Sequence, residues 1–242
     1  MFRGLKFLLL LCLSGCVSVW SHPDNMLYTP VSSGQYQIAT WSRMTDSTSP
    51  VHIYIEGDGY SFDARGRPTS DPTPRGTLVR DLASRDMSTN VVYMARPCQY
   101  IMSPKCHQSD WTDGRFSQEI VDSVYDAIRT VAGNRPIIMI GYSGGAMISG
   151  LVIAQHPELN VQKWITIAGV LNHHDWTEHF GDRPLTRSLD LEDLPDVPQL
   201  HYIAGMDRVV PNHLSYRWVS PENIIVESDA THTAFPTIKI VF

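Results

Sequence analysis

The sequence predicts an α/β fold, in which helices flank a mostly parallel central sheet, within a single folded domain. Three observations predict it. Helical and strand-like segments alternate after residue 77. Several strand-like segments are almost continuously apolar, which is typical of strands buried on both faces of a parallel sheet. No linker divides the chain, and its 242 residues, 43% of them hydrophobic, are enough for a sizeable core.

The expected strands are short segments that either alternate or run continuously apolar. They span residues 35–42, 51–55, 90–95, 136–140, 163–171, 199–204 and 223–227. The clearest helix covers 117–131, where Ile120, Val124 and Ile128 repeat at helical spacing and Ser117 can cap the start. Further helical segments are expected at 77–86 and 146–155, with a helical turn at 214–219, and a loop is expected at 63–76.

The first 16 residues have the composition of an export signal. Arg3 and Lys6 give a positive start, and a short apolar run from Phe7 to Leu13 follows. That run is shorter than the roughly 18 residues that a membrane-spanning helix needs. We therefore expect a removable leader, which takes no part in the fold.

The end of this leader, Leu13-Ser14-Gly15-Cys16, resembles the bacterial lipobox. The resemblance implies cleavage before Cys16 and a lipid on its thiol. Because Val17 and not Asp follows, it also implies an envelope protein anchored to the outer membrane and facing the periplasm. An ordinary signal peptide cleaved nearby is the alternative. The expected organisation is a lipoprotein-type signal at 1–15, an N-terminal tether at 16–35 that leads into the first strand, and one α/β domain at 36–242.

The charge of the chain argues against nucleic acid as a partner. Removal of residues 1–15 takes away Arg3 and Lys6 but no acidic residue, which changes the net charge from −6 to about −8. An acidic chain without a run of Lys or Arg lacks the cations that phosphate backbones bind. With a lipid on Cys16, the membrane would serve as an anchor and not as a passage.

The turn Gly141-Tyr142-Ser143-Gly144-Gly145 lies between an apolar strand and a helix of small residues. Gly-x-Ser-x-Gly in that context is the nucleophile-elbow pattern, in which a tight turn exposes the serine hydroxyl at the end of the sheet. We expect Ser143 to be a nucleophile and the backbone N–H of Gly144 to be one oxyanion donor. A Gly-Ser turn without chemistry is the alternative.

A serine hydroxyl needs a base to take its proton, and in this pattern the acid and the base follow the serine in the chain. Asp207 comes directly after the expected strand 199–204, so it is the candidate acid; a turn-capping aspartate is the alternative. His232 follows the last expected strand and is the candidate base. His213 lies before that strand and is expected to be a surface residue.

The second oxyanion donor should come from the loop after an early strand. Glu56-Gly57-Asp58-Gly59 follows the strand 51–55, and its position resembles the His-Gly-x segment of many esterases, with Glu where His is usual. The register of that resemblance implies the backbone N–H of Asp58 as the donor. The Asp58 carboxylate would then have to face away from the oxyanion. The flanking glycines leave a shift of the donor by one position open.

These motifs together resemble the α/β-hydrolase superfamily over roughly residues 50–240. Arg96-Pro97-Cys98-Gln99-Tyr100, with Cys106 downstream, also resembles a group of exported bacterial members. The resemblance implies a three-layer sandwich and hydrolysis at a carbonyl through an acyl-serine, with a small-molecule ester or acyl substrate. It implies no metal and no organic cofactor. It does not fix the substrate, because this fold hosts many functions.

The chain has four cysteines, and the leader and the lipid account for Cys12 and Cys16. In an oxidising compartment the remaining pair, Cys98 and Cys106, is expected to form a disulfide. Two free thiols are the alternative. A zinc site is disfavoured because the sequence has no CxxC partner for this pair.

Other functions stay open on the sequence alone. His173-His174-Asp175 with His179 suggests a metal site, but the sequence separation of five between His174 and His179 misses the i, i+4 spacing of one helical face. We expect instead that Trp176 and residues 172–198 form a small rim over the site. A peptidase, an acyltransferase and a non-catalytic envelope protein with the same shell are the alternatives to an esterase.

Overall fold

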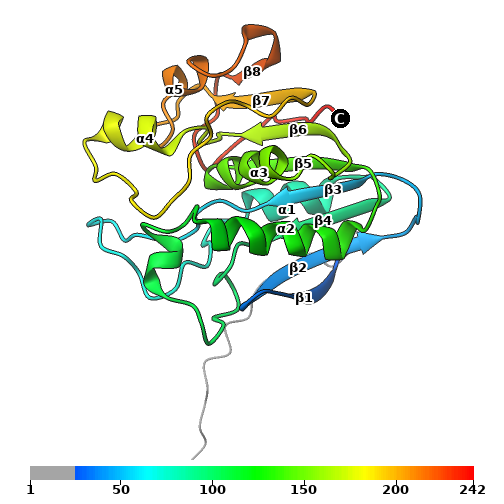
Figure 1. Ribbon diagram of the computed structural model, residues 1–242. Coiled ribbons are helices and arrows are strands. Elements are labelled where there is room, and N and C mark those ends of the chain that lie inside the picture. The colour runs from blue at the N-terminus through cyan, green and yellow to red at the C-terminus, as the bar shows by residue number, and fades with distance from the viewer. Residues whose placement is uncertain (1–24) are drawn as a thin grey trace, which may run out of the picture.

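The computed structural model describes residues 25–242 (Figure 1). The predicted signal at 1–15, Cys16 and the first part of the predicted tether lie outside the described residues. Within the described part of the chain, no helix is both long and apolar enough to span a bilayer.

One eight-stranded sheet forms the centre of the molecule, in the order β1-β2-β4-β3-β5-β6-β7-β8. Only β1 with β2 and β2 with β4 are antiparallel; the other neighbours pair in parallel. The mostly parallel sheet is therefore confirmed. The strands are β1 Leu27–Ser33, β2 Tyr36–Met44, β3 Val51–Ile55, β4 Asn90–Met94, β5 Ile137–Tyr142, β6 Val161–Ile167, β7 Gln199–Ala204 and β8 Ile224–Glu227.

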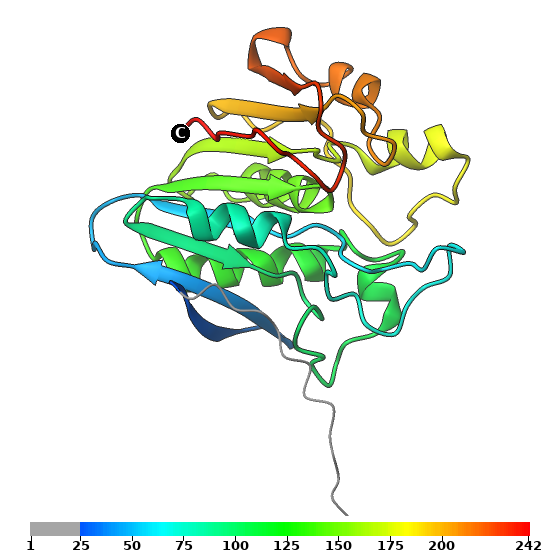
Figure 2. The ribbon, with the colours of Figure 1, turned by 180° about the vertical axis from the view of Figure 1, so that it is seen from behind.

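Helices lie on both faces of this sheet, as Figures 1 and 2 show. The longest pair, α2 and α3, covers one face, and α1 with the C-terminal segment covers the other. The helices are α1 Leu78–Arg85, α2 Gln118–Ala132, α3 Gly144–Gln155, α4 His173–Phe180 and α5 Asn212–Tyr216, with short 3₁₀ turns at η1 Gln108–Trp111 and η2 Pro221–Asn223. This is the predicted three-layer arrangement.

The continuous apolar run in β5 has a direct physical cause. Met139 packs into the core on the side of α2 and α3, whereas Ile138 and Ile140 pack into the core on the side of α1. Successive side chains of a strand point to opposite faces, so a central strand covered on both faces needs apolar residues at every position. All residues of β3 are buried as well, and its two polar side chains, His52 and Tyr54, both hydrogen-bond to the Asp86 carboxylate, at 2.7 and 2.9 Å.

The folded domain begins before residue 36, where the sequence had placed its start. Leu27–Ser33 forms the edge strand β1, which pairs with β2 over its whole length, so this part of the predicted tether belongs to the sheet. Only Val31 and Ser33 of β1 are buried, so the alternation that signals a strand is weak there.

Two further elements differ from expectation. Residues 163–171 were expected to form one strand, but β6 ends at Ile167 because Ala168 has a positive φ of 45°. The expected rim begins with a helix, α4, whose first turn is capped by the Asn172 side chain as it accepts a hydrogen bond from the Asp175 N–H. A helix of two turns gives too little periodicity to be recognised in the sequence.

His201 on β7 makes stability dependent on pH. Its side chain is buried beside Trp164, and its ring nitrogens contact Thr166 Oγ1 at 2.8 Å and Gln199 Oε1 at 3.0 Å. Burial lowers the pKa of His201 to about 4. Below the ordinary histidine pKa the unfolded chain therefore binds a proton that the folded chain does not, and stability falls as the pH falls.

We expect His201 to contribute up to about 3 kcal/mol to the loss of unfolding free energy between pH 6.5 and 4. His201→Gln should flatten this part of the profile, measured by urea unfolding at several pH values. The exposed His213→Gln is the matched control and should keep the wild-type slope. Equal slopes for wild type and His201→Gln would refute the assignment.

Candidate active site

The candidate site lies at the carboxyl end of β5, where the chain turns sharply into α3. Ser143 stands at this turn with a positive φ of 50°. Its N–H donates to the Ile167 carbonyl at 3.0 Å, and its own carbonyl accepts from Val170 N–H at 3.0 Å. A Cβ on Gly145 would lie 2.5 Å from the Ile55 carbonyl oxygen, so only glycine lets α3 approach β3 this closely.

The structure brings together the three residues that the sequence named as the triad. His232 Nε2 lies 3.0 Å from Ser143 Oγ, and His232 Nδ1 lies 2.8 Å from Asp207 Oδ2. The Asp207 side chain has no exposed surface, and its Oδ1 accepts hydrogen bonds from two backbone N–H groups of the following loop. The Tyr142 hydroxyl donates a hydrogen bond to the His232 carbonyl at 2.9 Å and holds the loop that carries His232 in place.

Two backbone N–H groups are free to serve as oxyanion donors. Gly144 is the first residue of α3, so its N–H has no partner within the helix. The N–H of Asp58 also has no acceptor anywhere in residues 25–242. Gly57 lies close by, because a Cβ on it would meet Ser143 Cβ at 3.0 Å. Both donors expected from the sequence therefore lie next to the serine.

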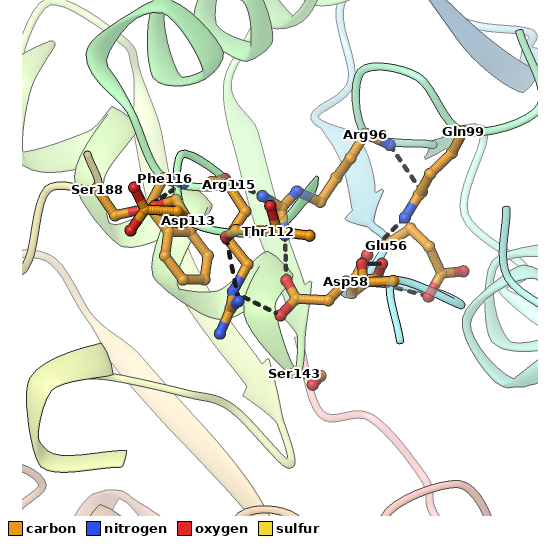
Figure 3. A network of polar contacts seen from close by, with 12 residues as sticks. Glu56, Asp58, Arg96, Gln99, Thr112, Asp113, Arg115, Phe116, Ser143 and Ser188 are labelled. Atoms are coloured by element: carbon orange, nitrogen blue, oxygen red, sulfur yellow. Dashed lines mark hydrogen bonds and ion pairs between the residues drawn. The ribbon is translucent and has the colours of Figure 1, made fainter. Parts of the chain in front are cut away.

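The Asp58 carboxylate lies close to the place where an oxyanion bound by the Gly144 N–H would be. A Cβ on Gly144 would come within 2.0 Å of Asp58 Oδ1, so the carboxylate packs against this glycine. Its charge is offset by two guanidinium groups: Oδ1 pairs with Arg96 Nη1, and Oδ2 lies 3.0 Å from Arg115 Nε (Figure 3). The two guanidinium groups thus compensate the charge of the Asp58 carboxylate beside Ser143.

The sequence analysis missed Arg96, Gln99 and Arg115 as site residues. Gln99 Nε2 donates to the Gly57 carbonyl at 2.9 Å, and Gln99 Oε1 accepts from the Arg96 N–H at 3.0 Å. Cys98 and Tyr100, on either side of Gln99, have φ angles of 71° and 62°, which non-glycine residues rarely adopt. The strained turn at 96–100 thus holds the loop that carries Gly57 and Asp58 in place. The positive φ angles of this turn could not be predicted from the sequence.

Glu56, the first residue of the loop after β3, is a buried carboxylate. Its Oε1 accepts from the Gly57 N–H at 2.9 Å, and its Oε2 accepts from the Tyr93 hydroxyl at 2.8 Å. Burial raises the pKa of the Glu56 carboxyl, although these hydrogen bonds oppose the rise. Glu56 therefore fixes the start of the loop that carries Asp58.

The expected disulfide between Cys98 and Cys106 is confirmed. The two sulfurs lie 2.09 Å apart, and the Cα atoms lie 5.8 Å apart. The bond closes the segment after β4 and ties the turn at 96–100 to the chain before η1. The disulfide therefore constrains the same turn that holds the loop with Gly57 and Asp58 in place.

Ser143 and His232 open into a pocket of about 310 Å³. The surface of the pocket is largely apolar, and few of the residues that line it are charged. The apolar lining consists of Leu78, Val79, Phe116, Val170, Trp176 and Val209. Trp176 and His173 come from α4, so the segment after β6 does form part of the rim, as expected. A pocket of this size is near the lower end of the range for small-molecule sites.

The metal alternative finds no support in the described part of the chain. Among residues 25–242, no group of three or more His, Cys, Asp and Glu side chains is placed to hold a metal ion. His179 instead contacts the rings of Phe180 and His213, and His173 lies 3.6 Å from Asp190. His213 is exposed, as expected.

Asp58→Asn should destabilise the protein by about 2 to 3 kcal/mol, because it leaves two buried guanidinium groups without their counter-charge. Urea unfolding measures this loss. Asp63→Asn is the matched control, since Asp63 pairs with the exposed Arg67 at 2.6 Å; it should cost less than about 1 kcal/mol. Similar losses in both variants would contradict a special role for the Asp58 cluster.

Replacement of both Cys98 and Cys106 by alanine should lower the unfolding free energy by about 2 to 3 kcal/mol, the chain-entropy value for so short a loop. Urea unfolding with and without a reducing agent is the measurement. The reductant should destabilise the wild type and leave the double variant unchanged. A wild type that is insensitive to complete reduction would overturn this expectation.

Neither a protein-family model nor a curated protein matches the sequence. Several solved structures are similar. An α/β serine hydrolase without a lid from Xanthomonas campestris has a TM-score of 0.57 at 15% identity, with 87% of each chain covered. An α/β serine hydrolase homologue from Coxiella burnetii has a TM-score of 0.55 at 17% identity, covering 86% of this chain and 89% of that one. A predicted CIB-like hydrolase from Thermoplasma acidophilum has a TM-score of 0.55 at 18% identity, covering 87% and 89%. At such identities the likeness concerns the fold, and the chain has the α/β-hydrolase fold.

Proposed function

We propose that the protein is a serine hydrolase that cleaves an ester of a small molecule through an acyl-serine intermediate. The observation that carries this proposal is the continuous contact from Ser143 through His232 to Asp207 at the mouth of a pocket. A buried carboxylate, an imidazole and a hydroxyl in this order are the parts that activate a serine.

The mechanism follows from the positions of these groups. His232 Nε2 takes the proton of Ser143 Oγ as the oxygen attacks the ester carbonyl, and Asp207 stabilises the imidazolium that results. The N–H groups of Gly144 and Asp58 bind the oxyanion. His232 then gives the proton to the leaving alkoxide, which departs as the alcohol. A water molecule, deprotonated by the same histidine, attacks the acyl group and releases the acid and Ser143.

The shape of the site favours a small and accessible ester. The pocket has a volume of about 310 Å³. Part of its rim is formed by the two-turn helix α4 and the chain that follows it. The similar Xanthomonas protein is described as lacking a lid. A short rim suits substrates that enter directly from solvent.

Labelling with a fluorophosphonate probe tests the proposal, because only an activated serine reacts quickly with it. The wild type should label, and Ser143→Ala and His232→Ala should lose labelling and ester hydrolysis by at least about a thousandfold. Ser47→Ala, in an exposed turn, is the matched control and should react like the wild type. A labelled Ser143→Ala protein would refute the nucleophile, and an inert wild type would favour a non-catalytic binding protein.

We also propose that the chain is lipidated at Cys16 and anchored in a bacterial envelope, on the strength of the Leu-Ser-Gly-Cys motif alone. Cells that express the full chain and are fed an alkyne fatty acid should incorporate it into the wild type and not into Cys16→Ser. Incorporation into both proteins, or into neither, would refute this anchor.

A further inference from the structure

One cation in the wall of the pocket has more hydrogen-bonding capacity than the protein uses. Arg115 is 6% exposed, and a guanidinium carries five N–H donors. Its Nη1 donates to the Thr112 carbonyl at 3.2 Å. Its Nε lies 3.0 Å from Asp58 Oδ2 but is not aligned to donate a hydrogen bond to it. Nη2 has no hydrogen-bond acceptor within residues 25–242, and in Figure 3 one terminal nitrogen has no dashed line to any residue drawn. The guanidinium also faces the rings of Phe116 and Trp176, with Cζ 5.4 and 5.8 Å from their centroids.

The charges around the pocket leave Arg115 in excess. Asp58 and Glu56 are the only acidic residues among those that line it. Asp58 is shared between Arg115 and Arg96, which is buried behind the loop, so one carboxylate faces two guanidinium groups. Glu56 is close to both Arg80 and Arg96. Arg75 adds a further cation at the exposed rim, where it lies 3.3 Å above the Tyr60 ring.

Next to Arg115, the wall of the pocket carries a second polar side chain, His173, whose hydrogen-bonding capacity is not fully used. His173 is 6% exposed and stacks on Phe116 with ring centroids 5.8 Å apart. Neither ring nitrogen makes a well-aligned hydrogen bond to residues 25–242, although the backbone of Ser188 and Leu189 lies near the ring. Its nearest carboxylate, Asp190, stays 3.6 Å away. Burial and the charge of Arg115 both lower the pKa of His173, which favours the neutral ring. Buried polar groups without partners are rare, and such groups beside a pocket point to a polar ligand.

We propose that Arg115 binds an anionic group of the substrate, a carboxylate or a phosphate, and so selects negatively charged esters. This inference rests on the proposed function. The planar guanidinium can donate two parallel hydrogen bonds to either anion, and its charge offsets the cost of taking the anion out of water. Arg75 at the rim would attract the same anions, and Phe116 and Trp176 would contact the apolar part of the molecule.

Two matched pairs of esters test this inference. Mono-4-nitrophenyl adipate and 4-nitrophenyl hexanoate differ in an anionic group on the acid side, and 4-carboxyphenyl acetate and phenyl acetate differ in one on the alcohol side. The readout is the ratio of kcat/KM for the anionic ester to that for its neutral partner. It is measured for the wild type, Arg115→Met, Arg115→Lys and the surface control Arg129→Met.

In at least one pair, Arg115→Met should lower this ratio by about 10- to 100-fold, the range for a hydrogen bond to a charged group. The change should lie mainly in KM; Arg115→Lys should restore part of it, and Arg129→Met should leave it unchanged. Added salt should weaken the wild-type preference. A ratio that Arg115→Met does not change in either pair overturns the inference.

The wild type alone provides a second measurement, should Arg115→Met fail to fold. Adipate should inhibit hydrolysis of the neutral hexanoate ester at concentrations where hexanamide does not, and inorganic phosphate beside acetate would distinguish the two anions. Equal inhibition by adipate and hexanamide also overturns the inference. Fluorophosphonate labelling separates the two proposals: a labelled enzyme without an anionic preference refutes only the subsite, and an unlabelled one refutes both.

Discussion

The close contact between the start of α3 and the ends of β3 and β5 is the constraint on which the site depends. Gly145 carries no side chain because the carbonyls of Ile55 and Glu56 occupy the space. This contact sets the sharp turn at Ser143 and its positive φ. It also brings the loop after β3 next to the serine. Ser143, the two backbone N–H groups proposed as oxyanion donors and the positive end of a helix therefore share one fixed point of the fold.

Around this point the protein uses charge in an unusual way. A carboxylate beside an oxyanion would oppose catalysis, yet Asp58 occupies this position. The guanidinium groups of Arg96 and Arg115 both pair with this carboxylate and offset its charge. The turn after β4, which carries Arg96 and Gln99 and is closed by the disulfide, supports this arrangement from behind. The arrangement around Ser143 thus depends on residues in the loop that follows a different strand.

The sequence could predict the elements whose signal is local. The apolar run before Ser143, the helical spacing from Ile120 to Ile128, and the order of serine, acid and histidine all depend on residues near one another or on chain order. The structure placed Ser143, Asp207 and His232 in contact, and the Cys98–Cys106 bond formed as expected. What the sequence could not show depends on tertiary contact. Arg115 and Gln99 look like ordinary loop residues until folding places them against Asp58 and Gly57. Strand β1 has too few buried positions for its pattern to show, and α4 depends on one capping asparagine.

The members of the site come from distant parts of the chain, and this has a consequence for folding. Ser143 and His232 are separated by 89 residues, and Asp58 and Arg96 by 38. Contacts between distant segments form late, because closing long loops costs entropy that only the finished core repays. His232 lies in the segment after β8, the last strand of the chain. A chain that is truncated before His232 therefore lacks a complete candidate site.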